Sequence, residues 1–207
     1  QGIDGDSDVG TDALAWYRSF HADQHRWGIY IPVSSLYYLS TRHLSPLRRP
    51  FSRKMELAYK ILFDHERFHF AVDYACAWLE LLMQAPVRAA LWKRTFPKQV
   101  SQQFLSFGIQ SYVEVEEKLA NALMLRELAQ EETPGARRRV EDFVRRQPRG
   151  YRDAGSVVSD DAFNDAVMEL LKTYSAPWLE HFGLRMTSLA LDGIRLLPLS
   201  VSDAVLH

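Results

Sequence analysis

The pattern that most constrains the fold of this 207-residue chain is an apolar seam that predicts one long helix. Apolar side chains and one histidine recur at steps of three and four, as the buried face of a helix requires. We expect the helix to run from about Ser52 to Gln84, just before Pro86. The seam consists of Leu57, Ile61, His65, Phe68, Val72, Cys76 and Leu79.

Two histidines of this helix bracket a glutamate in the pattern His65-Glu66-x-x-His69. Histidines four residues apart lie on one helix face, where both can bind a single metal ion. Two buried imidazoles need partners, and a metal supplies one for both. The alternative is a buried helix whose histidines are satisfied by hydrogen bonds alone. The placement on the seam favours a metal site, in which Glu66 can act on a metal-bound water.

We expect a third ligand on the second predicted helical region, which runs from about Val100 to Glu132. Carboxylates interrupt an otherwise apolar face there, and Glu116 and Glu117 each share a helix face with apolar residues. A carboxylate buried on either face needs a partner, and a metal would be one. Periodicity alone does not choose between Glu116 and Glu117.

The two segments together resemble the gluzincins, zinc peptidases whose third ligand is a glutamate on a helix downstream of His-Glu-x-x-His. They are similar, more narrowly, to the small intracellular branch associated with cleavage of phage and stress-response repressors, and to the Ste24/HtpX-type peptidases. In these families an alanine follows the ligand glutamate after three residues and an aspartate or asparagine after four. Glu117-Lys118-Leu119-Ala120-Asn121 has this pattern. The resemblance therefore favours Glu117 over Glu116 as the ligand.

What the resemblance implies is an intracellular, zinc-dependent metallopeptidase that hydrolyses a peptide bond in a protein partner. It implies that His65, His69 and Glu117 bind Zn²⁺, that Glu66 is the general base on a zinc-bound water, and that Asn121 orients a ligand histidine. The transition-state oxyanion needs a further donor from a later segment. The candidates are Tyr151, Arg152, Tyr174 and His181.

Charged residues stand beside the motif at two positions that such peptidases usually keep uncharged. Asp64 and Arg67 are three residues apart, so they can pair with each other on the helix surface. We expect them to lie on a wetter face of the helix.

The predicted fold is α+β, a predominantly helical, zincin-like domain with a small sheet near the N-terminus. Residues 1–12 are small and acidic and predict a disordered tail, which leaves 13–207 as a single metal-binding domain. Trp27–Val33 predicts a short strand, and Ser35–Thr41 a second strand or a short helix. Further elements are predicted at Arg137–Phe143 (helix), Gln147–Tyr151 (turn), Asp160–Tyr174 (helix) and Gly193–Leu199 (strand).

The composition indicates which cellular compartment and which kinds of partner to expect. A single cysteine excludes an internal disulfide and favours a reducing compartment, so we expect a cytoplasmic protein. The sequence has no apolar run of about 18 residues, so we expect no membrane span. The net charge of −1 gives no bulk attraction to nucleic acid.

Three other interpretations compete with a peptidase. Glu66-x-x-His69 is half of a di-iron or di-manganese site, but the chain has no second Glu-x-x-His. A catalytically inactive zinc-binding interaction protein would keep the site without the chemistry. Basic clusters at Arg48–Lys54 and Arg137–Arg152 could bind nucleic acid or an acidic partner; the alternative is that they are a solvated surface.

His21 and His25 repeat the four-residue spacing in a polar segment, and we expect them at the surface.

Overall fold

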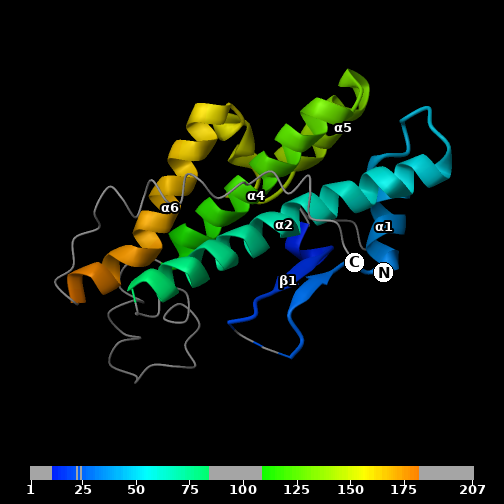
Figure 1. Cartoon of the computed structure of the whole chain (residues 1–207). Helices are drawn as coiled ribbons and strands as arrows, with labels where there is room; N and C mark the ends of the chain where they lie inside the picture. The colour runs from blue at the N-terminus through cyan, green and yellow to red at the C-terminus, as the bar shows by residue number, and fades with distance from the viewer. Residues whose placement is uncertain (1–10, 22, 24, 84–108, 182–207) are drawn as a thin grey trace, which may run out of the picture.

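The computed structural model describes residues 11–21, 23, 25–83 and 109–181, and α2 is its longest element. Figure 1 shows α2 crossing the molecule, with the sheet and α1 on one side and the later helices on the other. In chain order the elements are η1 (Thr11–Ala13), β1 (Trp16–Arg18), β2 (Gly28–Tyr30), α1 (Val33–Tyr38), η2 (Leu39–His43), α2 (Phe51–Met83), α4 (Ile109–Glu131), α5 (Pro134–Arg145), η3 (Arg152–Val157) and α6 (Asp160–His181).

The predicted fold class is confirmed, since the described chain is mostly helical with one small antiparallel sheet. Strands β1 and β2 pair with Tyr17 opposite Ile29. The predicted strand Trp27–Val33 is real but shorter, because Pro32 has no N–H to offer a sheet. The segment Ser35–Thr41 is helical: α1 continues into the single π-helical turn η2. Strand β1 was not predicted, because three residues are too few to show an alternating pattern.

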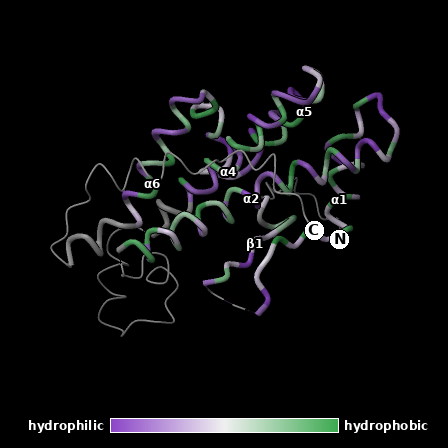
Figure 2. Tube along the Cα trace, in the orientation of Figure 1, coloured by the Kyte–Doolittle hydropathy of each residue, from purple (hydrophilic) through white to green (hydrophobic). Residues whose placement is uncertain are grey.

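The seam that predicted α2 is buried throughout, with every seam residue at most 3 % exposed. Hydrophobic and hydrophilic residues alternate along this helix in Figure 2, as expected where only part of its surface meets the core. Helix α2 begins at Phe51, one residue before the predicted start at Ser52. The predicted end, Gln84, lies outside the described residues. The first part of the second predicted helix, Val100–Gly108, and the predicted strand Gly193–Leu199 also lie outside them.

The two later helices extend beyond their predicted bounds. Helix α5 begins before Arg137 because Thr133 caps it, accepting a hydrogen bond from the backbone N–H of Ala136, and Pro134 occupies the first helical position. Helix α6 continues past Tyr174 to His181. It therefore passes through Pro177, although proline has no N–H for the helical ladder. The predicted turn at 147–151 is confirmed and leads into η3.

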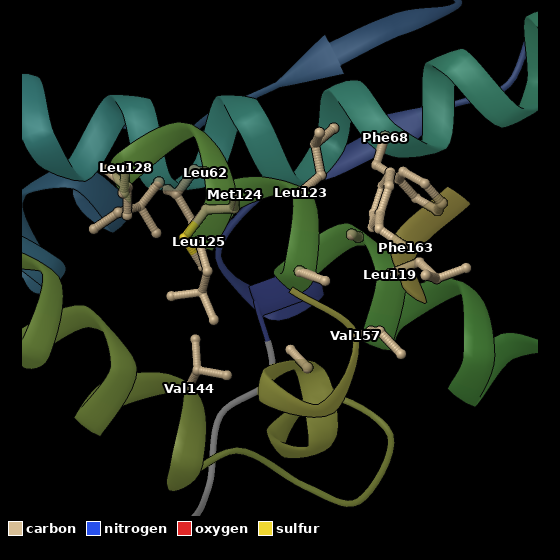
Figure 3. Close-up of a cluster of buried hydrophobic side chains, with 14 of the residues drawn as sticks. Leu62, Phe68, Leu119, Leu123, Met124, Leu125, Leu128, Val144, Val157 and Phe163 are labelled. Atoms are coloured by element: carbon tan, nitrogen blue, oxygen red, sulfur yellow. The ribbon is translucent and has the colours of Figure 1, made fainter. Parts of the chain in front are cut away.

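The core lies where α2, α4 and α6 meet (Figure 3). Phe68 of α2 packs edge-to-face on Phe163 of α6, with ring centroids 6.0 Å apart. Leu119 of α4 lies near these two rings and Leu128 lies at the other end of the cluster beside Leu62, and both leucines are fully buried. Burying each such side chain stabilises the fold by about 1.5 to 3 kcal/mol. Among the described elements, α2 and α4 share the most extensive contact.

Asp64 and Arg67 pair with each other as predicted, but they do so in the α2–α4 interface, so the predicted wetter face was wrong. Asp64 is only 4 % exposed. Its carboxylate contacts Lys60 at 3.0 Å and Arg67 at 3.4 Å. Helix α4 supplies the remaining counter-charges, because Arg67 pairs with Glu127 at 3.1 Å and Lys60 with Glu131 at 3.1 Å. Burial raises the pKa of Asp64, and the two cations oppose that shift. These charges join the two helices along one side of the core.

The predicted disordered tail is too long at its inner end. Thr11 lies in η1 and is fully buried. Its hydroxyl accepts a hydrogen bond of 2.8 Å from the side chain of Gln147, 136 residues further along the chain. Residues 1–10 lie outside the described part of the chain. Among the helices that the structure describes, none combines the length and apolarity needed to cross a membrane.

We expect Phe163→Ala to lower the free energy of unfolding by about 3 to 5 kcal/mol, because it leaves a cavity against Phe68 and removes the ring under Arg126. Phe51→Ala is the control: that side chain is 50 % exposed, and its loss should cost well under half as much. Urea unfolding followed by circular dichroism measures both. Equal losses in the two variants would contradict this assignment of the core.

Candidate metal centre

His65 and His69 project from successive turns of α2 toward Glu117 of α4, and the three side chains form one buried cluster. The Nε2 atom of His65 lies 3.1 Å from Oε2 of Glu117, and Nε2 of His69 lies 3.5 Å from the same oxygen. The two Nε2 atoms are 3.4 Å apart. One ligand atom from each residue therefore points into the same small space.

The spacing of these three atoms fits one tetrahedral metal ion. Zinc binds histidine nitrogen and carboxylate oxygen at about 2.0 to 2.1 Å, which puts two tetrahedral ligands about 3.3 Å apart. The three observed separations, 3.1, 3.4 and 3.5 Å, bracket that value. The cluster can hold a metal ion with little movement of its side chains.

The two neighbouring glutamates of α4 face different nitrogens of His69. Glu117 faces both Nε2 atoms. Glu116 lies on the other side of the His69 ring, with its Oε1 2.9 Å from Nδ1 of His69. Its second oxygen, Oε2, accepts a hydrogen bond from the hydroxyl of Tyr174 on α6. Both glutamates are buried, and each contacts the imidazole of His69. Glu116 therefore contacts His69 through Nδ1, whereas Glu117 faces its Nε2.

Asn121 contacts the other imidazole from behind. Its Oδ1 lies 2.9 Å from Nδ1 of His65. The side-chain nitrogen of Asn121 donates to Oε1 of Gln147 at 2.7 Å and to the backbone oxygen of Tyr151 at 3.1 Å. An amide oxygen only accepts, so Nδ1 of His65 carries the proton and Nε2 turns its lone pair toward the cluster. Gln147 was not predicted to take part, because it comes from a turn distant in sequence, and Tyr151 was predicted only as a candidate oxyanion donor.

Burial and charge set the protonation of the cluster. His65 is fully buried, whereas the side chains of His69 and Glu117 keep 13 % and 11 % exposure. Burial opposes charge on His69, but Glu117 and Glu116 outweigh it and hold its pKa well above the ordinary value. Burial likewise raises the pKa of Glu117, but the two histidines lower it to about 2. The carboxylate is therefore ionised, as a metal ligand must be.

Glu66 lies beside this cluster and is 2 % exposed. Its Oε1 has no hydrogen-bond partner in the described part of the chain. Burial raises the pKa of the carboxyl, and the nearby His65 and His69 oppose that rise. A buried carboxylate oxygen without a partner costs free energy, and a water or ligand in the site would satisfy it.

The predicted oxyanion donors fall into different places. Tyr151 stacks parallel to the ring of His65, with centroids 6.3 Å apart. Tyr174 bonds to Glu116, and Arg152 is exposed beside Asp153. His181 ends α6, and its side chain lies outside the described structure. Only the two tyrosines among the described candidates reach the surroundings of the cluster.

A second polar cluster holds the segment after β1 against α2, and it corrects our expectation for His21. The ring of His21 is only 10 % exposed, with Nδ1 2.8 Å from Asp73 and Nε2 2.9 Å from Glu80. Fully buried Asp73 also accepts hydrogen bonds from Tyr17 and Ser19. Burial works against charge on His21, but the two carboxylates raise its pKa to about 9. His25 is exposed, as predicted. Both ring nitrogens of His21 face carboxylates, so His21 joins Asp73 and Glu80 of α2; we call these three residues the His21 clamp. Neither nitrogen is left to bind a metal together with His25.

Comparison with known proteins leaves the site to be interpreted from its own geometry. Neither the protein-family models, nor the curated proteins, nor the solved structures contain a match to this chain.

We expect the His21 clamp to make stability depend on pH in the alkaline range. The folded pKa of about 9 exceeds the ordinary 6.5, so the contribution is complete below pH 6.5 and disappears as the pH rises through 9. His21→Gln should therefore lower the Tm at pH 6, and its deficit should shrink toward pH 10. Thermal unfolding across that range measures this. The exposed His25→Gln is the control, and a His21 deficit that stays constant with pH would contradict the assignment.

Proposed function

We propose that this protein is a zinc-dependent metallopeptidase that hydrolyses a peptide bond in a protein or peptide partner. The observation that carries the proposal is the buried convergence of His65, His69 and Glu117 beside Glu66, whose Oε1 has no partner among the described residues. In a hydrolytic site a general base must be free to take a proton from water, and an unpaired carboxylate oxygen meets that condition.

The donor set favours zinc over the common alternatives. Two imidazole nitrogens and one carboxylate oxygen suit zinc, whereas calcium and magnesium prefer oxygen ligands alone. Three protein ligands leave one position of a tetrahedral ion for water or substrate, as in catalytic zinc sites. Each ligand histidine also has a hydrogen-bond partner at its other ring nitrogen, because Asn121 contacts Nδ1 of His65 and Glu116 contacts Nδ1 of His69. The residues present therefore fit the ion.

Each residue then has a defined task in the proposed hydrolysis. Zinc bound at this site would supply a Lewis acid that polarises the scissile carbonyl and lowers the pKa of the attacking water. Glu66 would accept the proton of that water and pass it to the leaving amine. Its raised pKa suits both steps, because a carboxyl nearer neutrality both takes and returns a proton more readily. His65, His69 and Glu117 would hold the ion, and Asn121 would fix the tautomer of His65.

The competing interpretation, an interface for nucleic acid or an acidic partner at Arg137–Arg152, has less support. Nearby carboxylates already contact three of its cations: Arg145 lies 2.8 Å from Asp142, Arg149 lies 4.0 Å from Glu114 of α4, and Arg152 lies 3.9 Å from Asp153. Their positive charge is thus partly neutralised within the molecule. A cytoplasmic location stays a prediction, based on one cysteine that is buried in the fold.

We expect the purified protein to bind about one zinc ion per chain, and His65→Ala or Glu117→Ala to abolish that binding, since either change removes one of only three ligands. Metal analysis after dialysis against zinc measures the stoichiometry. His43→Ala is the control, because it removes a histidine outside the cluster. Full zinc content in the two ligand variants would show that the ligand set is wrong.

We expect Glu66→Gln to keep zinc but lose hydrolysis by at least about 100-fold, because an amide of the same size cannot act as general base. Turnover of a quenched-fluorescence peptide library by wild type and variant, with zinc content measured in parallel, provides the test. A fully active Glu66→Gln protein would remove Glu66 from the mechanism. A wild-type protein that binds zinc without cleaving the library or an unfolded protein would favour the inactive, zinc-binding alternative.

A further inference from the structure

A chain of three side chains runs from helix α6 to the proposed metal centre. The hydroxyl of Tyr174 donates to Oε2 of Glu116, and Oε1 of the same carboxylate lies 2.9 Å from Nδ1 of His69. Tyr174 is 4 % exposed and Glu116 is 6 % exposed, so water screens neither contact strongly. Neither residue belongs to the metal ligands or to the general base proposed above.

We propose that Tyr174 and Glu116 form a positioning arm that sets the orientation and basicity of His69 as a zinc ligand. This inference rests on the proposed metal site. Glu116 accepts the Nδ1 proton of His69, which leaves the lone pair of Nε2 for the ion. Tyr174 fixes the rotation of the carboxylate by holding its other oxygen. The arm thereby connects α6, through α4, to a ligand on α2.

The arm makes the two ligand histidines unequal. His65 has a neutral amide oxygen behind its ring, from Asn121, whereas His69 has a carboxylate. A hydrogen bond to an ionised acceptor is roughly twice as strong as one between neutral groups. It also transfers more electron density to the imidazole, so His69 should bind the ion more tightly than His65 does. The carboxylate of Glu116 thus affects the metal without touching it.

The rival explanation is that Tyr174 and Glu116 are merely a buried polar contact that holds α6 to α4. The two explanations differ in what should change when the contact is weakened. A purely structural contact would lower the stability of the zinc-free protein and leave the intrinsic zinc affinity alone. A positioning arm changes zinc affinity and the electronic environment of the ion in variants that stay folded.

The test uses the full chain with Glu116→Gln and Tyr174→Phe, both of which conserve side-chain volume. Asp160→Asn is the matched control, because the Asp160 contact with Arg126 also joins α6 to α4 but is exposed and belongs to no cluster residue. Three quantities are measured for each protein: the Kd for zinc against a chromophoric chelator, the visible absorption spectrum with cobalt(II) in place of zinc, and the Tm of the zinc-free form.

We expect Glu116→Gln to weaken zinc binding by about 10- to 100-fold and Tyr174→Phe by a smaller factor, with both shifting the cobalt spectrum. Asp160→Asn should leave the Kd and the spectrum unchanged. If Glu116→Gln and Tyr174→Phe bind zinc as tightly as wild type with an unchanged spectrum, the arm is overturned while the metal site stands. If the wild type binds neither zinc nor cobalt, the metal site itself fails, and the arm fails with it. The Kd for zinc and the cobalt(II) spectrum do not depend on catalysis, so the arm can be tested even in a protein that does not hydrolyse peptides.

Discussion

The burial of ionisable side chains between α2 and α4 is the constraint on which this structure depends. His65 on α2 and Glu116 and Glu117 on α4 are all less than 9 % exposed. A charge in such a place costs several kcal/mol unless it is paired, so each of these groups must face a partner across the interface. The register of α4 on α2 is therefore fixed by polar contacts as well as by the apolar core beside them.

Partners for these groups come from nearly every other part of the described chain. Thr11 near the N-terminus and Gln147 in a turn meet at Asn121, which holds His65. Tyr174 on α6 holds Glu116, which in turn holds His69. The cluster is thus connected through hydrogen bonds to segments separated by more than a hundred residues. Preorganisation of this kind is what a metal site requires if its ligands are to keep their geometry before the ion arrives.

The sequence predicted what depends on regular periodicity. The seam of α2, the burial of His65 and the presence of a carboxylate face on α4 all follow from steps of three and four. Prediction from the sequence failed where a side chain contacts a residue of another helix or turn. Asp64 could not be placed because its partners Lys60 and Arg67 look like surface residues until Glu127 and Glu131 are brought alongside. The same reason hid the role of Glu116, which depends on the position of Tyr174 on α6.

Charge balance gives a separate argument for the proposed metal site. Three buried carboxylates, Glu66, Glu116 and Glu117, surround two imidazoles. With the histidines neutral this group would carry up to three negative charges, and protonation of His69 offsets only one of them. Burial also raises the pKa of Glu66, which makes its charged form less favourable than that of a carboxyl in water. A divalent ion bound by His65, His69 and Glu117 would balance two negative charges at once. It would also favour the ionised form of Glu66, which is the state that a general base needs.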